Sequence, residues 1–250
     1  MCGKESCPVS DWIYGFFMAW GMFLAIPCPK KIWRESARRK MVACLPLVGL
    51  IAGLVWAGCV WLSSFLPLPL GALLCAAAPW LVTGFLHLDG FMDVCDAVLS
   101  RRDLETRQRI LKDSHCGAFA VICLVLLFLC QWAVFLSAGA IPLLPLVLVP
   151  VSCRACAALA VLTLRPIAVS QYSAMERGGA PVVFAALVLT GICALSAILW
   201  GSFAPLAAAA GYALAVWYAD RQLGGMSGDV SGFALTLGEL CGAAALVLWR

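Results

Sequence analysis

The clearest chemical signal in the sequence is a set of three aspartates between His87 and Asp96. Asp89, Asp93 and Asp96 follow one another at spacings of four and three residues. At about 100° per residue of an α-helix, their carboxylates fall within roughly 60° of one another. The residues between them are mostly apolar, so we expect the other faces of this helix to be buried. The three aspartates therefore form one predicted stripe of carboxylates.

Such a stripe needs compensation, because like charges repel one another and are costly to remove from water. A divalent cation supplies it. Mg²⁺ takes carboxylate oxygens, keeps several waters and is usually completed by substrate phosphates. Paired metal ions also stabilise the attacking and leaving oxygens of a phosphoryl displacement. The stripe predicts a Mg²⁺ site with Asp89, Asp93 and Asp96 as ligands; the alternative is an acidic, solvated helix face.

A second polar cluster, Lys112-Asp113-Ser114, stands directly before an apolar block. Lys112 is a candidate for contact with a phosphate, and Asp113 is a candidate for a further metal ligand. The alternative is that Asp113 or Ser114 caps the helix that follows, because short polar side chains accept hydrogen bonds from free N–H groups there. Local sequence leaves both interpretations open.

A glycine-rich segment near the C-terminus joins two apolar blocks and contains Gly224, Gly225, Ser227 and Asp229. Glycines allow close approach of the backbone, and successive N–H groups can surround phosphate oxygens. The segment is therefore a candidate anion site. Glycines also serve ordinary turns, which is the alternative.

Two charged residues, Arg154 and Glu239, lie inside apolar blocks. Ionisable groups at membrane depth are expensive when unpaired and are candidates for function. Their opposite charges predict either an ion pair between them or direct contacts with a substrate, and both interpretations stay open.

The elements that must position these residues are predicted membrane helices. Hydrophobic residues make up 64% of the chain and charged residues 12%, against about 45–50% and about 25% in soluble domains. Many of the apolar blocks are long enough to cross about 30 Å of hydrocarbon as helices. They are residues 12–28, 41–66, 68–86, 117–138, 141–164, 181–200, 203–219 and 230–249. We expect one all-α integral membrane domain over residues 1–250, with seven or eight transmembrane or re-entrant helices.

The distribution of charge predicts the orientation. Basic residues cluster in 30–40 and 101–112, which two predicted spans separate, so the clusters share one side and the positive-inside rule makes that side cytoplasmic. The polar loops predicted on this face, which would carry the active site, are residues 87–116, 165–180 and 220–229. The net charge of +4 fits topology and contact with lipid headgroups, and no dense basic face for nucleic acid is present. Homo-oligomerisation is left open.

Cysteine usage points to packing. Most of the 14 cysteines lie in apolar blocks, where they behave as small hydrophobic residues. Cys153 and Cys156 form a lone CxxC without a second pair, so neither a metal site nor a redox site is expected there.

The motifs taken together resemble a known family. The chain resembles the cobalamin synthases, also called adenosylcobinamide-GDP ribazoletransferases, in HLDGxxDxxD over residues 87–96 and KDSxxG over residues 112–117. LGGxSGD over 223–229 and LGEL over 237–240 are similar to the closing motif of that family, and Arg154 falls in the expected order. The resemblance covers nearly the full chain.

The resemblance implies a Mg²⁺-dependent enzyme integral to the cytoplasmic (inner) membrane of a prokaryote. Such an enzyme joins adenosylcobinamide-GDP to α-ribazole, or to its 5′-phosphate, and releases GMP. The product is adenosylcobalamin or its 5′-phosphate, and the step completes assembly of the nucleotide loop.

On this hypothesis Asp89, Asp93 and Asp96 hold Mg²⁺ across the diphosphate. Asp113 and Asp229 add ligands or orient the ribose hydroxyl of the acceptor. His87 deprotonates that hydroxyl or hydrogen-bonds a metal-binding aspartate. The predicted substrate contacts are Lys112, Ser114, Arg154, Gly224, Gly225, Ser227 and Glu239.

Two other functions are alternatives. Membrane alcohol phosphotransferases and prenyltransferases also use aspartate-rich Mg²⁺ motifs, but the HLDG context and the spacing around Asp93 fit neither usual pattern. A cation-coupled transporter would relay ions through Asp89, Glu239 and Arg154. Transporters often show inverted internal repeats, and none is found here.

Overall fold

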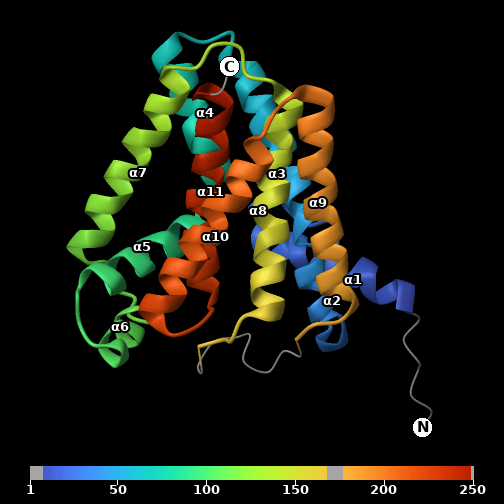
Figure 1. Ribbon diagram of the computed structural model, residues 1–250, viewed down its shortest axis with the longest axis vertical. Helices are drawn as coiled ribbons and strands as arrows, with labels where there is room; N and C mark the ends of the chain where they lie inside the picture. The colour runs from blue at the N-terminus through green and yellow to red at the C-terminus, as the bar shows by residue number, and fades with distance from the viewer. Residues whose placement is uncertain (1–7, 168–176, 249–250) are drawn as a thin grey trace.

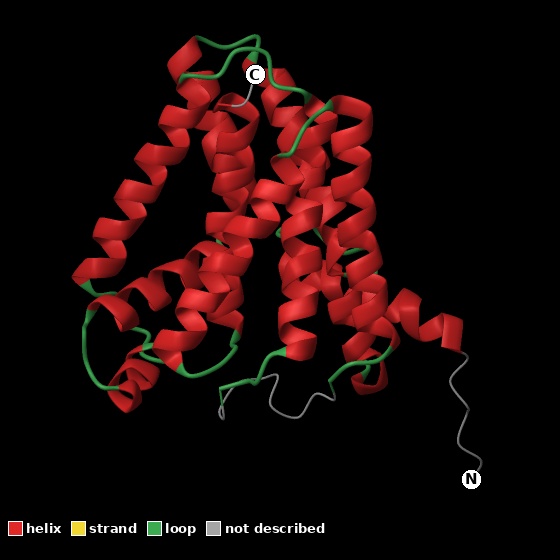
Figure 2. Cartoon of the chain, viewed as in Figure 1, coloured by secondary structure: helices red, strands yellow, loops and turns green. Residues whose placement is uncertain are grey.

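The computed structural model describes residues 8–167 and 177–248, and the elements of this part of the chain are helices joined by loops (Figure 2). Within these residues the only β-type pairing is an isolated bridge between Pro166 and Met226. The helices are α1 (Pro8–Phe23), the 3₁₀ helix η1 (Glu35–Ala37), α2 (Arg38–Ala43), α3 (Leu45–Ser63), α4 (Leu68–Val82), α5 (Leu86–Leu99), α6 (Leu104–Ile110), α7 (Ala118–Leu136), α8 (Leu143–Thr163), α9 (Ala180–Trp200), α10 (Ala204–Leu223) and α11 (Gly228–Leu248). The predicted all-α class is confirmed.

Five of the described helices, α3, α7, α8, α9 and α11, are long and apolar enough to cross a membrane. Helices α4 and α5 meet at 90° and pass the same test only when taken together. Counted as one broken span, they would make a sixth. The sequence predicted seven or eight spanning or re-entrant helices, so the structure gives fewer candidate spans than expected.

The difference has a local cause at each missing span. Helix α1 has 16 residues, and its buried Asp11 pairs with Lys40 of α2 at 3.1 Å. The first apolar block is therefore tied to the basic segment that follows it. Helix α10 has 20 residues but is rich in alanine and carries Asp220 and Arg221 in its last turn, which lowers its hydropathy below that of a typical span.

The charged connections gather at one end of the bundle (Figure 1). Helices α2 and α6 and the turn between α10 and α11 lie at the lower end of that view. The uncharged connections 64–67, 137–142 and 201–203 lie at the opposite end. In the described part of the chain, the connections that carry charge and those that carry none thus lie at opposite ends of the bundle.

Small residues let the central helices approach closely, which is the usual device for packing helices in lipid. Helices α10 and α11 run antiparallel, and α8 packs against both and against α3. At Gly49 of α3, an added Cβ would lie 2.7 Å from the carbonyl oxygen of Pro150 in α8. Gly53 meets Val147 of α8 in the same way. These contacts fix α8, which carries Arg154, in the centre of the bundle.

Helix α4 contains a proline whose missing N–H is compensated by neighbouring helices. Pro79 cannot donate to the carbonyl of Cys75, four residues earlier. The indole Nε1 of Trp56 in α3 donates to that carbonyl instead, at 2.8 Å. Gln131 of α7 donates to the next carbonyl, that of Ala76, also at 2.8 Å. The Cys75 carbonyl freed by the proline and the neighbouring Ala76 carbonyl thus link α4 to α3 and α7.

This arrangement predicts a background-dependent effect of Trp56→Phe. The substitution leaves the buried Cys75 carbonyl without a donor, so we expect the free energy of unfolding to fall by about 1–3 kcal/mol. In a Pro79→Ala background the loss should be smaller, because that substitution supplies a backbone N–H to the same carbonyl. Thermal unfolding in detergent measures both. An equal loss in the two backgrounds would contradict this account of the carbonyl.

Candidate active site

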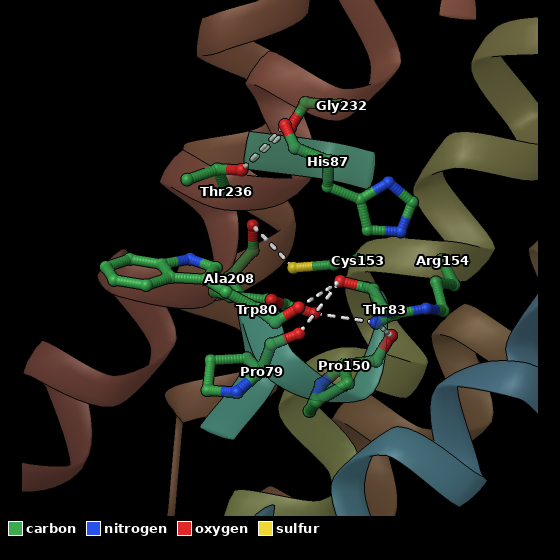
Figure 3. Close-up of polar contacts among 11 residues, drawn as sticks. Pro79, Trp80, Thr83, His87, Pro150, Cys153, Arg154, Ala208, Gly232 and Thr236 are labelled. Atoms are coloured by element: carbon green, nitrogen blue, oxygen red, sulfur yellow. Dashed lines mark hydrogen bonds and ion pairs between the residues drawn. The ribbon is translucent and has the colours of Figure 1, made fainter. Parts of the chain in front are cut away.

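The position of α5 is set by a sharp bend after α4. Gly84 and Phe85 both adopt left-handed backbone angles, with φ of 59° and 64°. For a residue with a side chain this conformation costs about 1–2 kcal/mol of free energy, so the surrounding packing must hold Phe85 there. The hydroxyl of Thr83 donates to the carbonyl of Pro79 at 3.0 Å (Figure 3). The bend turns α5 across the bundle, near the end where the charged loops gather (Figure 1).

Helices α5 and α11 cross almost in backbone contact. A Cβ added at Gly90 would lie 2.9 Å from both the Cα and the carbonyl oxygen of Asp229. A Cβ added at Gly232 would lie 3.0 Å from the carbonyl oxygen of His87. The hydroxyl of Thr236 donates to that same carbonyl at 3.3 Å (Figure 3). The crossing therefore needs glycine on both helices.

This crossing brings carboxylates from two distant parts of the chain together. Asp93 is half-buried and is repelled by the charges of Asp89, Asp229 and Asp96. Asp229 stands in the first turn of α11, where Ser227 donates to its Oδ2 at 3.3 Å and accepts from the N–H of Val230 at 3.2 Å. Ser227 thus caps α11 and restrains Asp229 with one hydroxyl group.

Asp96 makes a different contact from the other two stripe aspartates. Its Oδ1 accepts from the N–H of Ala120 at 3.0 Å and its Oδ2 from the N–H of Gly117 at 2.5 Å. A Cβ at Gly117 would lie 2.6 Å from Oδ1, so the first turn of α7 accepts this carboxylate only with glycine there. The contact joins the last aspartate of HLDGxxDxxD to the glycine of KDSxxG. Asp96 anchors α7, and its predicted role as a metal ligand stays a prediction.

Beside the crossing lies a cavity of about 110 Å³. Its polar wall brings together four of the predicted site residues, His87, Asp89, Arg154 and Asp229, from α5, α8 and α11. The rest of the lining is Phe23, Val42, Leu45, Leu86, Ala157, Val161, Gly228, Ser231 and Leu235. Figure 3 shows the imidazole of His87 projecting from α5 toward α8, the helix that carries Arg154.

The predicted pairing of Arg154 with Glu239 is confirmed. Nη1 of Arg154 lies 2.6 Å from Oε1 of Glu239, and the two residues are 1% and 4% exposed. Three buried nitrogens near the cavity have no hydrogen-bond partner: Nε and Nη2 of Arg154, and Nε2 of His87. Buried polar atoms are seldom left unpaired in native proteins.

The segment Lys112-Asp113-Ser114 lies outside the cavity. All three residues are exposed, and Asp113 contacts Nδ1 of His115 at 2.6 Å. This hydrogen bond raises the pKa of His115 above its ordinary value and lowers the pKa of Asp113. Neither Asp113 nor Ser114 caps α7, since the N–H groups of Gly117 and Ala120 at its start donate to Asp96. These three residues do not line the cavity, and their substrate roles stay predictions.

The glycine-rich segment forms a turn whose N–H groups are largely used inside the protein. Gly224 ends α10 with φ of 75°, and its N–H donates to the carbonyl of Asp220 at 2.8 Å. The N–H of Met226 donates to the carbonyl of Arg165 at 2.8 Å, and Gly225 leaves no room for a Cβ against Ile167. The N–H groups of Gly224 and Met226 are thus used within the protein, and the predicted anion site at Gly224 and Gly225 stays a prediction. Residues 168–176 of the predicted 165–180 loop lie outside the described part of the chain.

Two residues that line the cavity, Phe23 and Ser231, were not among the predicted site residues. The ring of Phe23 stacks on His87 with centroids 6.3 Å apart. Ser231 lines the cavity, and its hydroxyl lies 3.2 Å from that of Tyr212. Nothing marks Phe23 among the other aromatic residues of its apolar block. Ser231 had a visible signal, since it is a polar residue beside Asp229 at the start of an apolar helix.

The donor set suits Mg²⁺ in chemistry. Among the described residues no three His, Cys, Asp or Glu side chains form a ready-made ligand set. Asp89, Asp93 and Asp229 offer hard carboxylate oxygens, which Mg²⁺ prefers, and Mg²⁺ usually takes one or two carboxylates and completes its octahedron with waters and substrate phosphates. These residues would hold the ion together with a phosphorylated ligand.

Comparison with known proteins points to one family. Residues 15–247 match the family described as cobalamin-5-phosphate synthase. The chain is 36% identical over 246 residues to an adenosylcobinamide-GDP ribazoletransferase of Clostridium botulinum (strain Alaska E43 / Type E3), covering 94% of this chain and 97% of the relative. Proteins of the same name match from Clostridium perfringens (strain 13 / Type A), 36% over 248 residues with 92% and 95% covered, and Geobacillus kaustophilus, 36% over 252 residues with 94% and 93% covered. No solved structure matches significantly.

The crossing of α5 and α11 predicts that Gly90→Ala is destabilising. The added methyl meets backbone atoms of Asp229 that cannot rotate away, so we expect a loss of about 1–3 kcal/mol, the usual cost of overpacking. Gly58→Ala in α3 is the matched control, because a Cβ there meets nothing within 4 Å. It should be neutral or slightly stabilising. Thermal unfolding in detergent compares the two, and equal effects would mean that the crossing is looser than described.

Proposed function

The chain belongs to the cobalamin-5-phosphate synthase family, and from this premise we propose that it transfers adenosylcobinamide phosphate from adenosylcobinamide-GDP to α-ribazole or α-ribazole 5′-phosphate. The family predicted from the sequence motifs is confirmed. The protein is accordingly a transferase of cobalamin synthesis. The substrates and the Mg²⁺ requirement are the parts proposed here, and the names of the relatives support the substrates.

The observation that carries the proposal is the meeting of Asp89, Asp93 and Asp229 at the crossing of α5 and α11, beside a cavity lined by Arg154. A diphosphate diester carries negative charge on both phosphoryl groups, and its reaction depends mostly on positioning and charge neutralisation. Carboxylates that need a divalent cation, opposite a buried guanidinium, fit such a substrate.

In the proposed reaction a ribose hydroxyl of the acceptor attacks the phosphorus nearer cobinamide. A new P–O bond forms to the acceptor, the P–O bond to GMP breaks, and GMP leaves with the bonding electrons. Bound Mg²⁺ would supply charge neutralisation across the diphosphate. Asp229, which Ser227 restrains by a hydrogen bond, would orient the attacking hydroxyl. His87 is the proposed acceptor of its proton, since its unpaired Nε2 is buried beside the same cavity.

We propose that Asp89, Asp93 and Asp229 share the metal-binding role. For Asp96 we propose the anchoring of α7, because both of its carboxylate oxygens accept backbone hydrogen bonds. Helix α7 then fixes the end of α5 that lies beyond Asp93. This differs from the ligand set expected from spacing alone, which counted Asp96 and not Asp229.

We further propose that the active site faces the cytoplasm in the plasma membrane of a prokaryote. The support is the gathering of basic segments at the end of the bundle toward which α5 lies (Figure 1), together with the positive-inside rule. The relatives reported above are bacterial proteins.

The test is a reconstituted assay with adenosylcobinamide-GDP, each ribazole form and Mg²⁺, in which GMP and the cobalamin product are followed by chromatography. Asp93→Asn should lower kcat by at least about 100-fold, the scale of losing one interaction with the charge of a transition state. EDTA should abolish turnover. Glu105→Gln in the exposed helix α6 is the control and should retain full activity.

Two results would overturn the proposal. Turnover that persists in EDTA would remove the metal from the mechanism. Folded protein that forms no product with either ribazole form would reject the proposed substrates.

A further inference from the structure

Arg154 is the only charged residue of α8 and is 1% exposed. One side of its guanidinium is satisfied, since Nη1 lies 2.6 Å from Oε1 of Glu239 and 3.4 Å from the carbonyl oxygen of Pro150. Its Nε and Nη2 are buried without a partner. A buried guanidinium with two unpaired nitrogens is a costly arrangement.

The two unpaired nitrogens are not a random pair. Nε and Nη2 form one edge of the planar guanidinium, and such an edge presents two parallel N–H groups. This is the geometry with which arginine binds carboxylates and phosphates in bidentate fashion. Glu239 contacts only Nη1, so the edge suited to an oxyanion is the one left without a partner.

The surroundings of Arg154 select the kind of oxyanion. Arg154 shares the cavity of about 110 Å³ with Asp89 and Asp229. This volume corresponds to only a few water molecules at about 30 Å³ each, so a single small group fits and the whole substrate does not. A protein carboxylate in that space would be repelled by the two aspartates. A phosphoryl group that binds together with a divalent cation would suit both sides of the cavity. The cation would neutralise the two aspartates, and the phosphoryl oxygens would accept hydrogen bonds from Arg154.

We propose that the Nε–Nη2 edge of Arg154 binds a phosphoryl group of the diphosphate substrate, and that Glu239 is a positioning residue that holds the guanidinium in place for this contact. The inference rests on the proposed function and adds how the cavity holds the phosphoryl group opposite the carboxylates. Glu239 balances the charge of Arg154 without touching the substrate, in contrast to the substrate contact that the sequence left open for it.

A purely structural pair would hold α8 to α11 and do nothing else. Arg154→Lys separates the two roles, because lysine keeps the positive charge beside Glu239 but loses the bidentate edge. We expect near-normal thermal stability and a kcat/KM at least about 100-fold lower. Glu239→Gln keeps a hydrogen-bond acceptor for Nη1 and should mainly raise KM for adenosylcobinamide-GDP, with a smaller change in kcat.

The double variant Arg154→Glu with Glu239→Arg tests position directly. It restores an ion pair between α8 and α11 but moves the guanidinium to the other helix. Thermal stability should recover relative to either single charge reversal, whereas activity should stay lost. Gln131→Leu is the structural control, since Gln131 is buried in α7 and does not line the cavity. It should lower stability and leave kcat/KM of the folded protein unchanged.

A binding measurement separates this inference from the proposed function. Mg²⁺ with pyrophosphate should raise the unfolding temperature of the wild-type protein and have no such effect on Arg154→Lys, whether or not the proposed substrates turn over. Equal stabilisation of the two proteins would overturn the inference. So would near-normal kcat/KM in Arg154→Lys, or activity regained in the double variant.

Discussion

The crossing of α5 over α11 is the contact on which the rest of the site depends. Gly90 and Gly232 let the two backbones touch, and this places the first turn of α11 beside the aspartate stripe of α5. The bend at Gly84 and Phe85 is what directs α5 across the bundle. Without the bend, the stripe would continue along the axis of α4 and would not meet Asp229. The geometry of the backbone thus decides which carboxylates face each other.

Charge is arranged around this crossing in two layers. The carboxylates at the crossing repel one another, and the proposed Mg²⁺ would relieve this repulsion. Deeper in the bundle, the charges of Arg154 and Glu239 neutralise each other. Either charge alone would be strongly destabilising in these apolar surroundings. In the proposed complex, the carboxylates would hold the metal ion and the guanidinium of Arg154 would contact the phosphoryl oxygens. Asp96 belongs to neither layer, because its carboxylate accepts hydrogen bonds from the free N–H groups at the start of α7.

Much of the site was predictable from residue types and spacing. The i, i+4, i+7 pattern placed Asp89 and Asp93 on one helix face, and opposite charges in apolar blocks predicted the pair of Arg154 and Glu239. The contact between Asp96 and Gly117 was not predictable, because it joins two motifs through a turn whose path depends on tertiary packing. Seven or eight spanning or re-entrant helices are not confirmed among the described residues, where five helices qualify as spans, or six with the bent pair. Apolar composition does not show where a helix bends, as at Gly84, nor that Asp11 pairs with Lys40 of the following basic segment.

In the proposed site, carboxylates from α5 and α11 bind one divalent cation together with the diphosphate. Electron paramagnetic resonance of Mn²⁺, used in place of Mg²⁺, measures this most directly on protein in lipid nanodiscs with pyrophosphate present. The account predicts a saturable Mn²⁺ site in the wild type that is weakened by Asp89→Asn on α5 and equally by Asp229→Asn on α11. Undiminished Mn²⁺ binding in Asp229→Asn would contradict it, because the site would then belong to α5 alone.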